Sequence, residues 1–336
     1  MITQEDIQKH DPEEMHKAYD KWDQLAYDAY KSELDIVEFK DIDHVVFSGM
    51  GGSGTIGDIF SSILSKKNIH TTVVKGYLLP ETVDDSTLVL TSSVSGNTTE
   101  TISTLESANK KNCKTIAFSS GGKMESYCLK NNIEFRKIPE THSPRASLPS
   151  YIYSILKTLN SIFPIGRNEI TESIDQLEKI SSIISSDNLS KNNISLELAN
   201  WIDGAPIIYY PWGLEAAAIR FKNSLQENAK SHAFVENVIE SGHNGIVSWE
   251  RSSNMTPIMI QGQDDHLKTK ERWSIVRQYF DQNNIGYKEI HSVTGGILSK
   301  IMCLIYVLDY SSIYYAIRLG VNPTPIKSID FIKEKL

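Results

Sequence analysis

The sequence contains little cysteine: only Cys113, Cys128 and Cys303 among 336 residues. The number is odd, and no C-x-x-C pair or cysteine–histidine spacing typical of a zinc site occurs. This scarcity argues against a disulfide framework and against a structural metal centre. It is typical of proteins that keep their thiols reduced in the cytosol. We therefore expect a cytoplasmic protein that binds no metal.

The sequence also lacks a secretory signal, a long apolar run and an excess of positive charge. Residues 1–6 have neither the basic nor the apolar region of a signal peptide. The longest apolar run, residues 301–308, is far too short to span a bilayer. The formal net charge is −8, which argues against nucleic acid as the main partner. We expect neither a membrane nor a nucleic acid among the partners.

The length predicts more than one domain, because 336 residues exceed what a single hydrophobic core usually organises. Prolines at 144 and 149 interrupt the pattern of the first half. A stretch rich in serine, asparagine and charge follows from residue 170 to residue 198. We therefore predict a first domain at residues 1–150, a helical connector at 151–198 and a second domain at 199–336.

Strands that alternate with helices indicate an α/β fold with parallel sheets covered on both faces. A single helix is expected first, from Asp11, its N-cap, to about Tyr30. The apolar runs that predict strands in the first half are residues 44–48, 71–74, 87–91, 114–118 and 133–138. In the second half they are residues 206–210, 256–261 and 287–292, with helices at 214–229, 268–283 and 297–316. The pattern thus repeats weakly, as two αβα sandwiches in tandem.

A glycine-rich turn, Gly49-Met-Gly-Gly-Ser-Gly54, follows the first predicted strand and opens a helix. It matches the G-x-G-x-x-G pattern of dinucleotide-binding proteins. That function requires an acidic residue at the end of the second strand, for the ribose hydroxyl. Residues 71–76 read Thr-Thr-Val-Val-Lys-Gly and contain no acid, which disfavours NAD(P). Alternatively, the glycines only allow the chain to make a tight turn and bind no ligand.

A second polar turn, Ser93-Val-Ser-Gly-Asn-Thr98, also lies between a predicted strand and a helix. The carboxyl ends of parallel strands share one edge of the sheet, so the two turns can converge there. Backbone amides at two helix N-termini would add donors and the positive ends of the helix dipoles. The combination predicts a site for a monophosphate, formed by Gly51, Gly52, Ser53, Ser93, Ser95 and Thr98.

These two turns resemble the phosphate-binding signatures of sugar isomerase (SIS) domains. Four further segments narrow the resemblance: residues 143–149, 227–230, 243–244 and 309–325. Together they are similar to the bifunctional phosphoglucose/phosphomannose isomerases, over nearly the whole chain and in order. The resemblance implies two tandem SIS domains. It also implies a hexose 6-phosphate substrate and interconversion of glucose 6-phosphate, and of mannose 6-phosphate, with fructose 6-phosphate. It implies no metal and no cofactor.

The resemblance also implies the roles of four side chains in proton transfer through a cis-enediol. Glu227 corresponds to the glutamate that moves the proton, and Arg145 can stabilise the enediolate charge. Lys300 corresponds by position to a ring-opening lysine. His243 can open the sugar ring and, in the family, reaches the site of the partner subunit, so a homodimer is implied. Read from the residues alone, Glu227, Arg145 and Lys300 could each be ordinary surface groups.

The sequence departs from the family pattern at three positions. Val94 stands where an aromatic residue is usual, Gly242 precedes the histidine, and Gly245 replaces a glutamate. Two alternatives therefore remain open: another SIS-type reaction on a sugar phosphate, and a non-catalytic protein that binds a phosphosugar. A stripe of tyrosines at 306, 310, 314 and 315 is expected to serve helix packing or a dimer interface rather than a stacking site.

Overall fold

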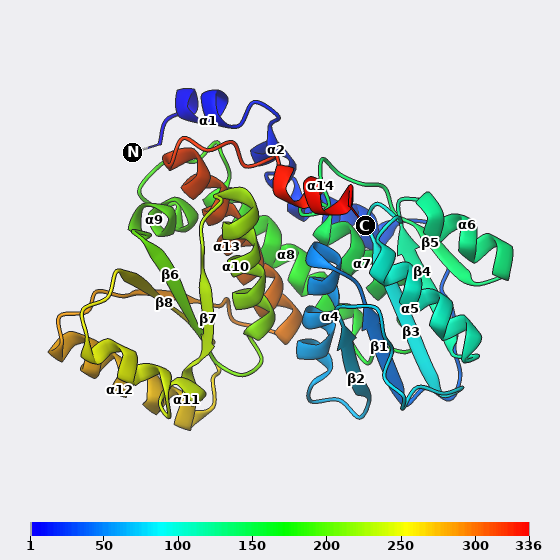
Figure 1. Ribbon diagram of the computed structural model, residues 1–336. Coiled ribbons are helices and arrows are strands. Elements are labelled where there is room, and N and C mark those ends of the chain that lie inside the picture. Colours follow the sequence, from blue (N-terminus) through cyan, green and yellow to red (C-terminus); the bar gives the residue numbers. More distant parts are fainter. Residues whose placement is uncertain (1, 336) are drawn as a thin grey trace. The chain divides into compact units, whose positions relative to one another are not determined.

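The computed structural model describes residues 2–335, which form two compact units (Figure 1). Unit 1 combines the residues up to Asp20 with Glu169–Ile326. Unit 2 combines Lys21–Asn168 with the segment that begins at Lys327. Each unit therefore contains a terminal segment that comes from the other end of the chain, and each has its own sheet.

The sheet of unit 2 has five parallel strands in the order β2-β1-β3-β4-β5. Every residue of β1 and β3 is buried, as expected for strands covered on both faces. The strand order reverses between β1 and β3, which makes their carboxyl ends a topological switch point, the usual place for a ligand. The strand bounds are β1 His44–Ser48, β2 His70–Val74, β3 Thr87–Ser93, β4 Lys114–Ser119 and β5 Glu134–Lys137.

Helices cover both faces of this sheet. One helix crosses from β1 to β2, and two others lead from β3 to β4 and from β4 to β5 in the opposite direction. Because such crossovers are right-handed, the two groups lie on opposite faces. Two further helices, α3 and α7, pack against each other. The helices of unit 2 are α3 Trp22–Lys31, α4 Gly51–Leu64, α5 Thr99–Lys110, α6 Gly122–Asn131, α7 Leu148–Thr158 and α14 Lys327–Lys333.

The sheet of unit 1 has four parallel strands in the order β7-β6-β8-β9. Three match the predicted strands: β6 Ala205–Tyr210, β8 Met255–Gln261 and β9 Lys288–His291. The sequence analysis missed β7, Phe234–Asn237. This edge strand has only four residues, two of them polar, so it has no apolar run to reveal it. The prediction of two parallel α/β sheets is confirmed.

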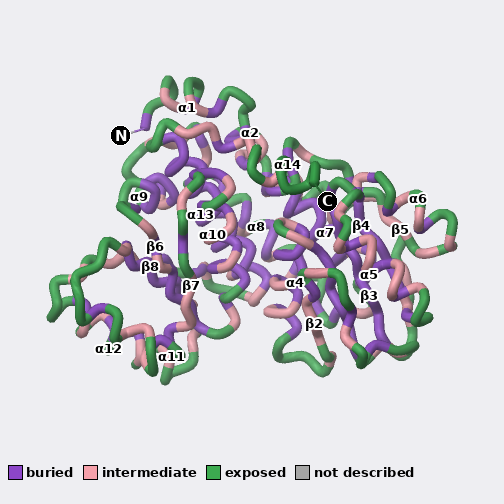
Figure 2. The backbone as a smooth tube through the Cα atoms, viewed as in Figure 1, coloured by how far each residue is buried: buried purple, intermediate pink, exposed green. Residues whose placement is uncertain are grey.

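Helix α13, Ile297–Arg318, forms the centre of unit 1 and is buried along most of its length (Figure 2). Within residues 2–335 it is the one helix long and apolar enough to cross a membrane. However, 89% of its most apolar 18-residue stretch is buried inside the protein. The other helices of this unit are α1 Gln4–His10, α2 Met15–Tyr19, α8 Arg167–Ile184, α9 Ile194–Trp201, α10 Glu215–Asn228, α11 Val238–Ser241, α12 Leu267–Gln282 and the 3-10 helix η1 Gly245–Glu250.

The tyrosine stripe on α13 packs inside unit 1. The hydroxyl of Tyr306 donates to the carbonyl oxygen of Tyr19 at 2.6 Å. The hydroxyl of Tyr314 donates to the carbonyl oxygen of Ile184 at 2.9 Å. Of the two functions expected for the stripe, helix packing is the one that these contacts show.

The single helix expected from Asp11 to Tyr30 is wrong. Two helices, α2 and α3, occupy this range instead, and α1 ends before it. The Asp11 carboxylate accepts hydrogen bonds from the backbone of Met15 and His16, so α2 begins only there. The chain breaks again at Asp20, whose carboxylate accepts hydrogen bonds from the hydroxyls of Ser186 and Tyr310, both at 2.6 Å. The contacts of Asp20 join residues far apart in sequence, so local pattern alone does not predict the break at Asp20.

Candidate functional site

The two polar turns lie side by side at the carboxyl edge of the unit 2 sheet. Strands β1 and β3 are neighbours, with Ser48 opposite Thr91. The hydroxyl of Ser92 donates to the carbonyl oxygen of Ser53 at 3.3 Å. A side chain at Gly49 would lie 2.8 Å from the backbone of Ser53, so only glycine allows this approach. The structure therefore brings the predicted phosphate-binding residues of both turns together.

The first turn presents backbone amides at the start of α4. The N-cap residue Met50 makes no side-chain capping bond, which leaves the first amides of the helix without that partner. Gly51 has a φ of +53°, a left-handed conformation that favours glycine. Gly52 is half-buried, and Ser53 is buried at 7% exposure. The turn thus offers amides and one hydroxyl at a helix N-terminus.

The second turn presents hydroxyls at the start of α5. Ser93 Oγ and Thr98 Oγ1 are 2.9 Å apart, and Ser93 Oγ also accepts a hydrogen bond from the Gly96 amide. Because the Thr98 hydroxyl is bonded to Ser93, it does not cap its own helix. Ser95 is exposed and accepts from the Asn97 amide at 3.3 Å. The start of α5 is therefore uncapped, as is that of α4.

Two adjacent helix N-termini without side-chain caps, surrounded by hydroxyls, form an arrangement suited to an anion. The sequence analysis missed a cation beside it. Lys75 follows β2, and a Cβ at Gly54 would lie 3.3 Å from its Cε atom. The Lys75 ammonium pairs with Asp58 at 2.6 Å. A lysine at the end of a strand that neighbours the first turn is a signal that could have identified it.

Val94, where the family usually has an aromatic residue, is buried at 4% exposure. Its carbonyl oxygen accepts hydrogen bonds from the amide and the hydroxyl of Ser120, at 3.0 and 2.7 Å. The backbone between Ser93 and Ser95 is thereby held against the turn that follows β4.

Arg145 lies in a loop that serine side chains hold in place. Ser147 Oγ accepts a hydrogen bond from the Thr141 amide at 2.8 Å and donates to the Ser143 carbonyl oxygen at 3.0 Å. Ser143 Oγ in turn accepts from the Ala146 amide at 3.4 Å. Arg145 is only 4% exposed, so it is not the exposed loop arginine of the alternative interpretation.

Glu227 lies in the last turn of α10 and is half-buried. The next residue, Asn228, donates from its side chain to the Ser312 hydroxyl of α13 at 2.8 Å. The ammonium of Lys230 donates to the carbonyl oxygens of Glu227 and Asn228, at 2.8 and 3.2 Å. It also donates to the carbonyl oxygens of Asn322 and Pro323. The end of α10 that contains Glu227 is thus held by contacts from the residues that follow it.

Lys300 lies in the first turn of α13 and pairs with Asp264, with 2.6 Å between the ammonium and the carboxylate. Its side chain is 14% exposed, whereas that of Asp264 is 70% exposed. The hydrogen bond from Lys300 lowers the pKa of Asp264. Lys300 is therefore not a freely solvated surface lysine.

His243 is exposed on the turn that follows α11, and its amide donates to the Glu240 carbonyl oxygen at 2.8 Å. A carboxylate that the sequence analysis missed lies beside this turn. Glu236 of β7 occupies the space over Gly245, where any Cβ atom would collide with its carboxylate. Burial, together with the neighbouring Glu240, raises the pKa of Glu236. Because β7 had not been predicted, no sequence signal pointed to Glu236.

The predicted site residues therefore fall into two groups by unit. Unit 2 contains Arg145 and the phosphate-binding residues of the two turns, and unit 1 contains Glu227, His243 and Lys300. Among residues 2–335, no cluster of three histidine, cysteine or acidic side chains is placed to hold a metal ion.

The class of protein follows from comparison with known families. Residues 38–160 match the SIS domain, and residues 191–336 match the family described as bacterial phospho-glucose isomerase C-terminal SIS domain. Tagatose-6-phosphate ketose/aldose isomerase from Escherichia coli has a similar fold, with a TM-score of 0.66 and 15% identity over 95% of this chain and 93% of that one. The chain is a protein of two SIS domains, as predicted.

Relatives identify the family within that class. A bifunctional phosphoglucose/phosphomannose isomerase from Caldicellulosiruptor bescii is 33% identical over 97% of this chain and 96% of its own length. A D-glucosamine-6-phosphate 4-epimerase from Sulfolobus acidocaldarius is 26% identical over 96% of this chain and 97% of its own. The chain belongs to the family of bifunctional phosphoglucose/phosphomannose isomerases, which confirms the resemblance seen in the sequence.

Proposed function

We propose that this protein interconverts glucose 6-phosphate and mannose 6-phosphate with fructose 6-phosphate, by metal-free proton transfer through a cis-enediol. Membership of the family supports a phosphosugar isomerase. The observation that carries the proposal is the contact between the first turn and the end of β3, directly before the second turn: Ser92 Oγ donates to the Ser53 carbonyl oxygen at 3.3 Å. This contact joins two uncapped helix N-termini and their hydroxyls into one cradle for a dianion.

The proposal gives each site residue one task. Glu227 takes a proton from C2 of the open aldose and returns it to C1 of the enediol, which yields the ketose. Arg145, buried and always charged, stabilises the negative charge that develops on the enediolate oxygen. His243 and Lys300 open the sugar ring by proton transfer at the ring oxygen. The phosphate is held by the turns that contain Ser53, Ser93, Ser95 and Thr98.

A coupled assay with each of the three hexose 6-phosphates, in the presence of EDTA, tests the reaction. We expect turnover of glucose 6-phosphate and mannose 6-phosphate to fructose 6-phosphate that chelation does not reduce. Turnover that stops with EDTA and returns with a divalent cation would contradict the metal-free mechanism. Binding of a hexose 6-phosphate without turnover of any of the three would favour the non-catalytic alternative.

Glu227→Gln tests the assignment of the base. The amide keeps the shape of the side chain but cannot accept the proton, so we expect kcat to fall by about a thousandfold or more while the sugar phosphate still binds. Glu250→Gln, which changes an exposed carboxylate in the same unit, is the matched control and should keep wild-type turnover. Near-wild-type activity of Glu227→Gln would rule out this base.

The homodimer in which His243 serves the partner's site stays a prediction, as does the cytoplasmic location. Mixing two inactive variants tests the dimer directly. If His243 acts across the interface, a heterodimer of Glu227→Gln and His243→Ala contains one site with both groups intact. Subunit exchange should then restore about half of the wild-type activity per heterodimer. No recovery, with heterodimers shown by native mass spectrometry, would place His243 in its own subunit's site.

The epimerase relative supports a second candidate, a stereochemical change on an amino sugar phosphate. Incubating the protein with glucosamine 6-phosphate and identifying the products by NMR distinguishes epimerisation from isomerisation. We expect no epimer from this protein. Formation of the 4-epimer at a rate above that of fructose 6-phosphate turnover would reverse the assignment.

A further inference from the structure

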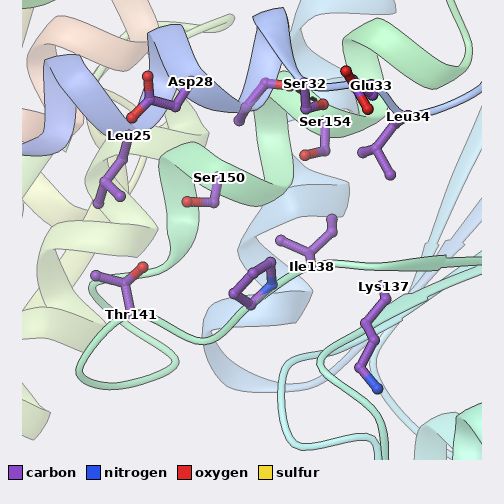
Figure 3. Close-up of a pocket in the computed structure, with 12 residues that line it drawn as sticks. Leu25, Asp28, Ser32, Glu33, Leu34, Lys137, Ile138, Thr141, Ser150 and Ser154 are labelled. Carbon is purple, nitrogen blue, oxygen red and sulfur yellow. Dashed lines mark hydrogen bonds between the residues drawn. The ribbon is translucent and has the colours of Figure 1, made fainter.

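Unit 2 contains a cavity of about 510 Å³ between α3, α7 and the segment that follows β5 (Figure 3). Its volume lies in the range of small-molecule sites. Leu25, Leu34, Ile138 and Pro139 are among the apolar residues that line it. The phosphate-binding turns follow β1 and β3, whereas β5 is the edge strand of the sheet. No residue of those turns lines the cavity, so it is a separate feature of the unit.

Two buried hydroxyls face this cavity from one side of α7. Ser150 and Ser154 are one helical turn apart, and they are only 8% and 3% exposed. Within residues 2–335 neither hydroxyl has a hydrogen-bond partner. Their oxygens are not among the fully buried polar atoms that lack a partner, so they remain accessible from the cavity and able to bond to a ligand. A ligand with a hydroxyl group would satisfy both.

Two carboxylates also line the cavity and give it a negative charge. Asp28 lies on α3, and Glu33 follows the end of that helix (Figure 3). Gln24 donates to one oxygen of Asp28 at 2.7 Å, and neither carboxylate forms an ion pair among the described residues. The one basic residue of the lining, Lys137, directs its ammonium to Glu125 at 3.1 Å, and Figure 3 shows it pointing away from the carboxylates.

We propose that this cavity binds a small amphipathic amine, an organic cation with an apolar body and a hydroxyl group. The carboxylates of Asp28 and Glu33 attract the ammonium, the apolar body contacts Leu25, Leu34 and Ile138, and the hydroxyl bonds to the serines of α7. A sugar phosphate does not fit this description, since its dianion would face two carboxylates. The inference is independent of the proposed function.

Three probes of one shape and different charge test the proposal by calorimetric titration, with fructose 6-phosphate present throughout. Tyramine is the cation, 4-ethylphenol the neutral analogue and 4-hydroxyphenylacetate the anion. Two exposed carboxylate contacts together give about a tenfold preference for tyramine over 4-ethylphenol. We expect the anion to bind most weakly. Equal affinity for all three probes would overturn the proposal.

Variants then separate the charge from the hydroxyls. Asp28→Asn/Glu33→Gln should abolish the preference for tyramine, whereas Asp23→Asn/Asp35→Asn, which changes two carboxylates outside the cavity, should keep it. Ser150→Ala/Ser154→Ala should weaken tyramine and 4-ethylphenol by the same factor, because both contain the phenol hydroxyl.

Filling the cavity is the last test. Ala29 lines it, and Ala29→Phe should abolish binding of all three probes while the circular dichroism spectrum remains that of the wild type. Unchanged tyramine binding in this variant, or in Asp28→Asn/Glu33→Gln, would place the amine elsewhere and end the proposal. Because these comparisons use binding alone, they stand whether or not the protein isomerises fructose 6-phosphate.

Discussion

Arg220 of α10 and Asp309 of α13 form an ion pair that is buried in unit 1. Arg220 Nε and Nη2 donate to the same carboxylate oxygen at 2.9 and 2.7 Å, and Ser224 Oγ donates to the other at 2.6 Å. Burial alone would lower the pKa of the guanidinium, but the carboxylate raises it above its ordinary value. Because α10 ends just beyond Glu227, this pair fixes the helix that places the proposed base.

Removing one partner of this pair should destabilise unit 1 strongly. Asp309→Asn leaves the Arg220 charge buried without a counter-ion, and we expect the free energy of unfolding to fall by about 3–5 kcal/mol. The double variant Arg220→Met/Asp309→Leu removes both charges and should lose much less. Urea unfolding followed by circular dichroism measures both. Equal losses in the single and double variants would show that the cost lies in packing rather than in the uncompensated charge.

The effects on stability of changes at Gly245 and at Glu236 should also depend on each other. Gly245→Ala moves the Glu236 carboxylate, which is the end of a flexible and half-buried side chain, so we expect a loss of only about 0.5 kcal/mol in stability. Combining Gly245→Ala with Glu236→Ala removes the clash, so the double variant should be more stable than the sum of the two single changes. Thermal unfolding of all four proteins gives the coupling. Strict additivity would mean that the two residues do not compete for this space.

The sheets could be predicted from the sequence because their central strands, such as β1, β3, β6 and β8, are largely apolar runs followed by turns. The same pattern placed Ser53, Ser93 and Thr98 at one edge, where the Ser92–Ser53 contact joins the turns. Such predictions succeed because neighbouring parallel strands determine which turns can meet.

The remaining features could not be predicted, because they depend on contacts between distant residues. Glu236 lies on a strand too short and too polar to be recognised, so its place over Gly245 had no signal. The break at Asp20 depends on Ser186 and Tyr310, which are far away in the sequence. Arg145 is a different case: it lies in an irregular loop held by local serine hydrogen bonds, for which no helix or strand periodicity gives a signal.

The pH dependence of stability should include a contribution from Glu236, whose pKa is raised above its ordinary value of 4.5 by burial and by Glu240. Such a carboxyl binds more protons in the folded than in the unfolded state, so stability falls as the pH rises from the ordinary pKa through the folded one. Glu236→Gln cannot ionise and should lack this fall.

Melting temperatures of wild type and Glu236→Gln between about pH 4 and pH 7 test this, since the variant should gain on the wild type as the pH rises. Glu250→Gln, at an exposed position, should keep a constant difference from the wild type. If the difference between Glu236→Gln and the wild type were also constant, the Glu236 carboxyl of the wild type would have the same pKa in the folded and the unfolded state.

The hydroxyl pair of the second turn should contribute to substrate binding more than to the chemical step. Ser93 Oγ and Thr98 Oγ1 lie 2.9 Å apart at the start of α5. In the proposed function they contact the phosphate and not the carbon atoms that react. An interaction made equally in the ground state and the transition state raises KM when it is lost and leaves kcat unchanged. Ser93→Ala/Thr98→Ala should therefore raise KM for fructose 6-phosphate by about a hundredfold, which corresponds to two hydrogen bonds to a charged group. Ser107→Ala removes a hydroxyl from the same helix far from its start and should leave KM unchanged. If the double variant instead showed a lower kcat and an unchanged KM, this turn would not be part of the phosphate site.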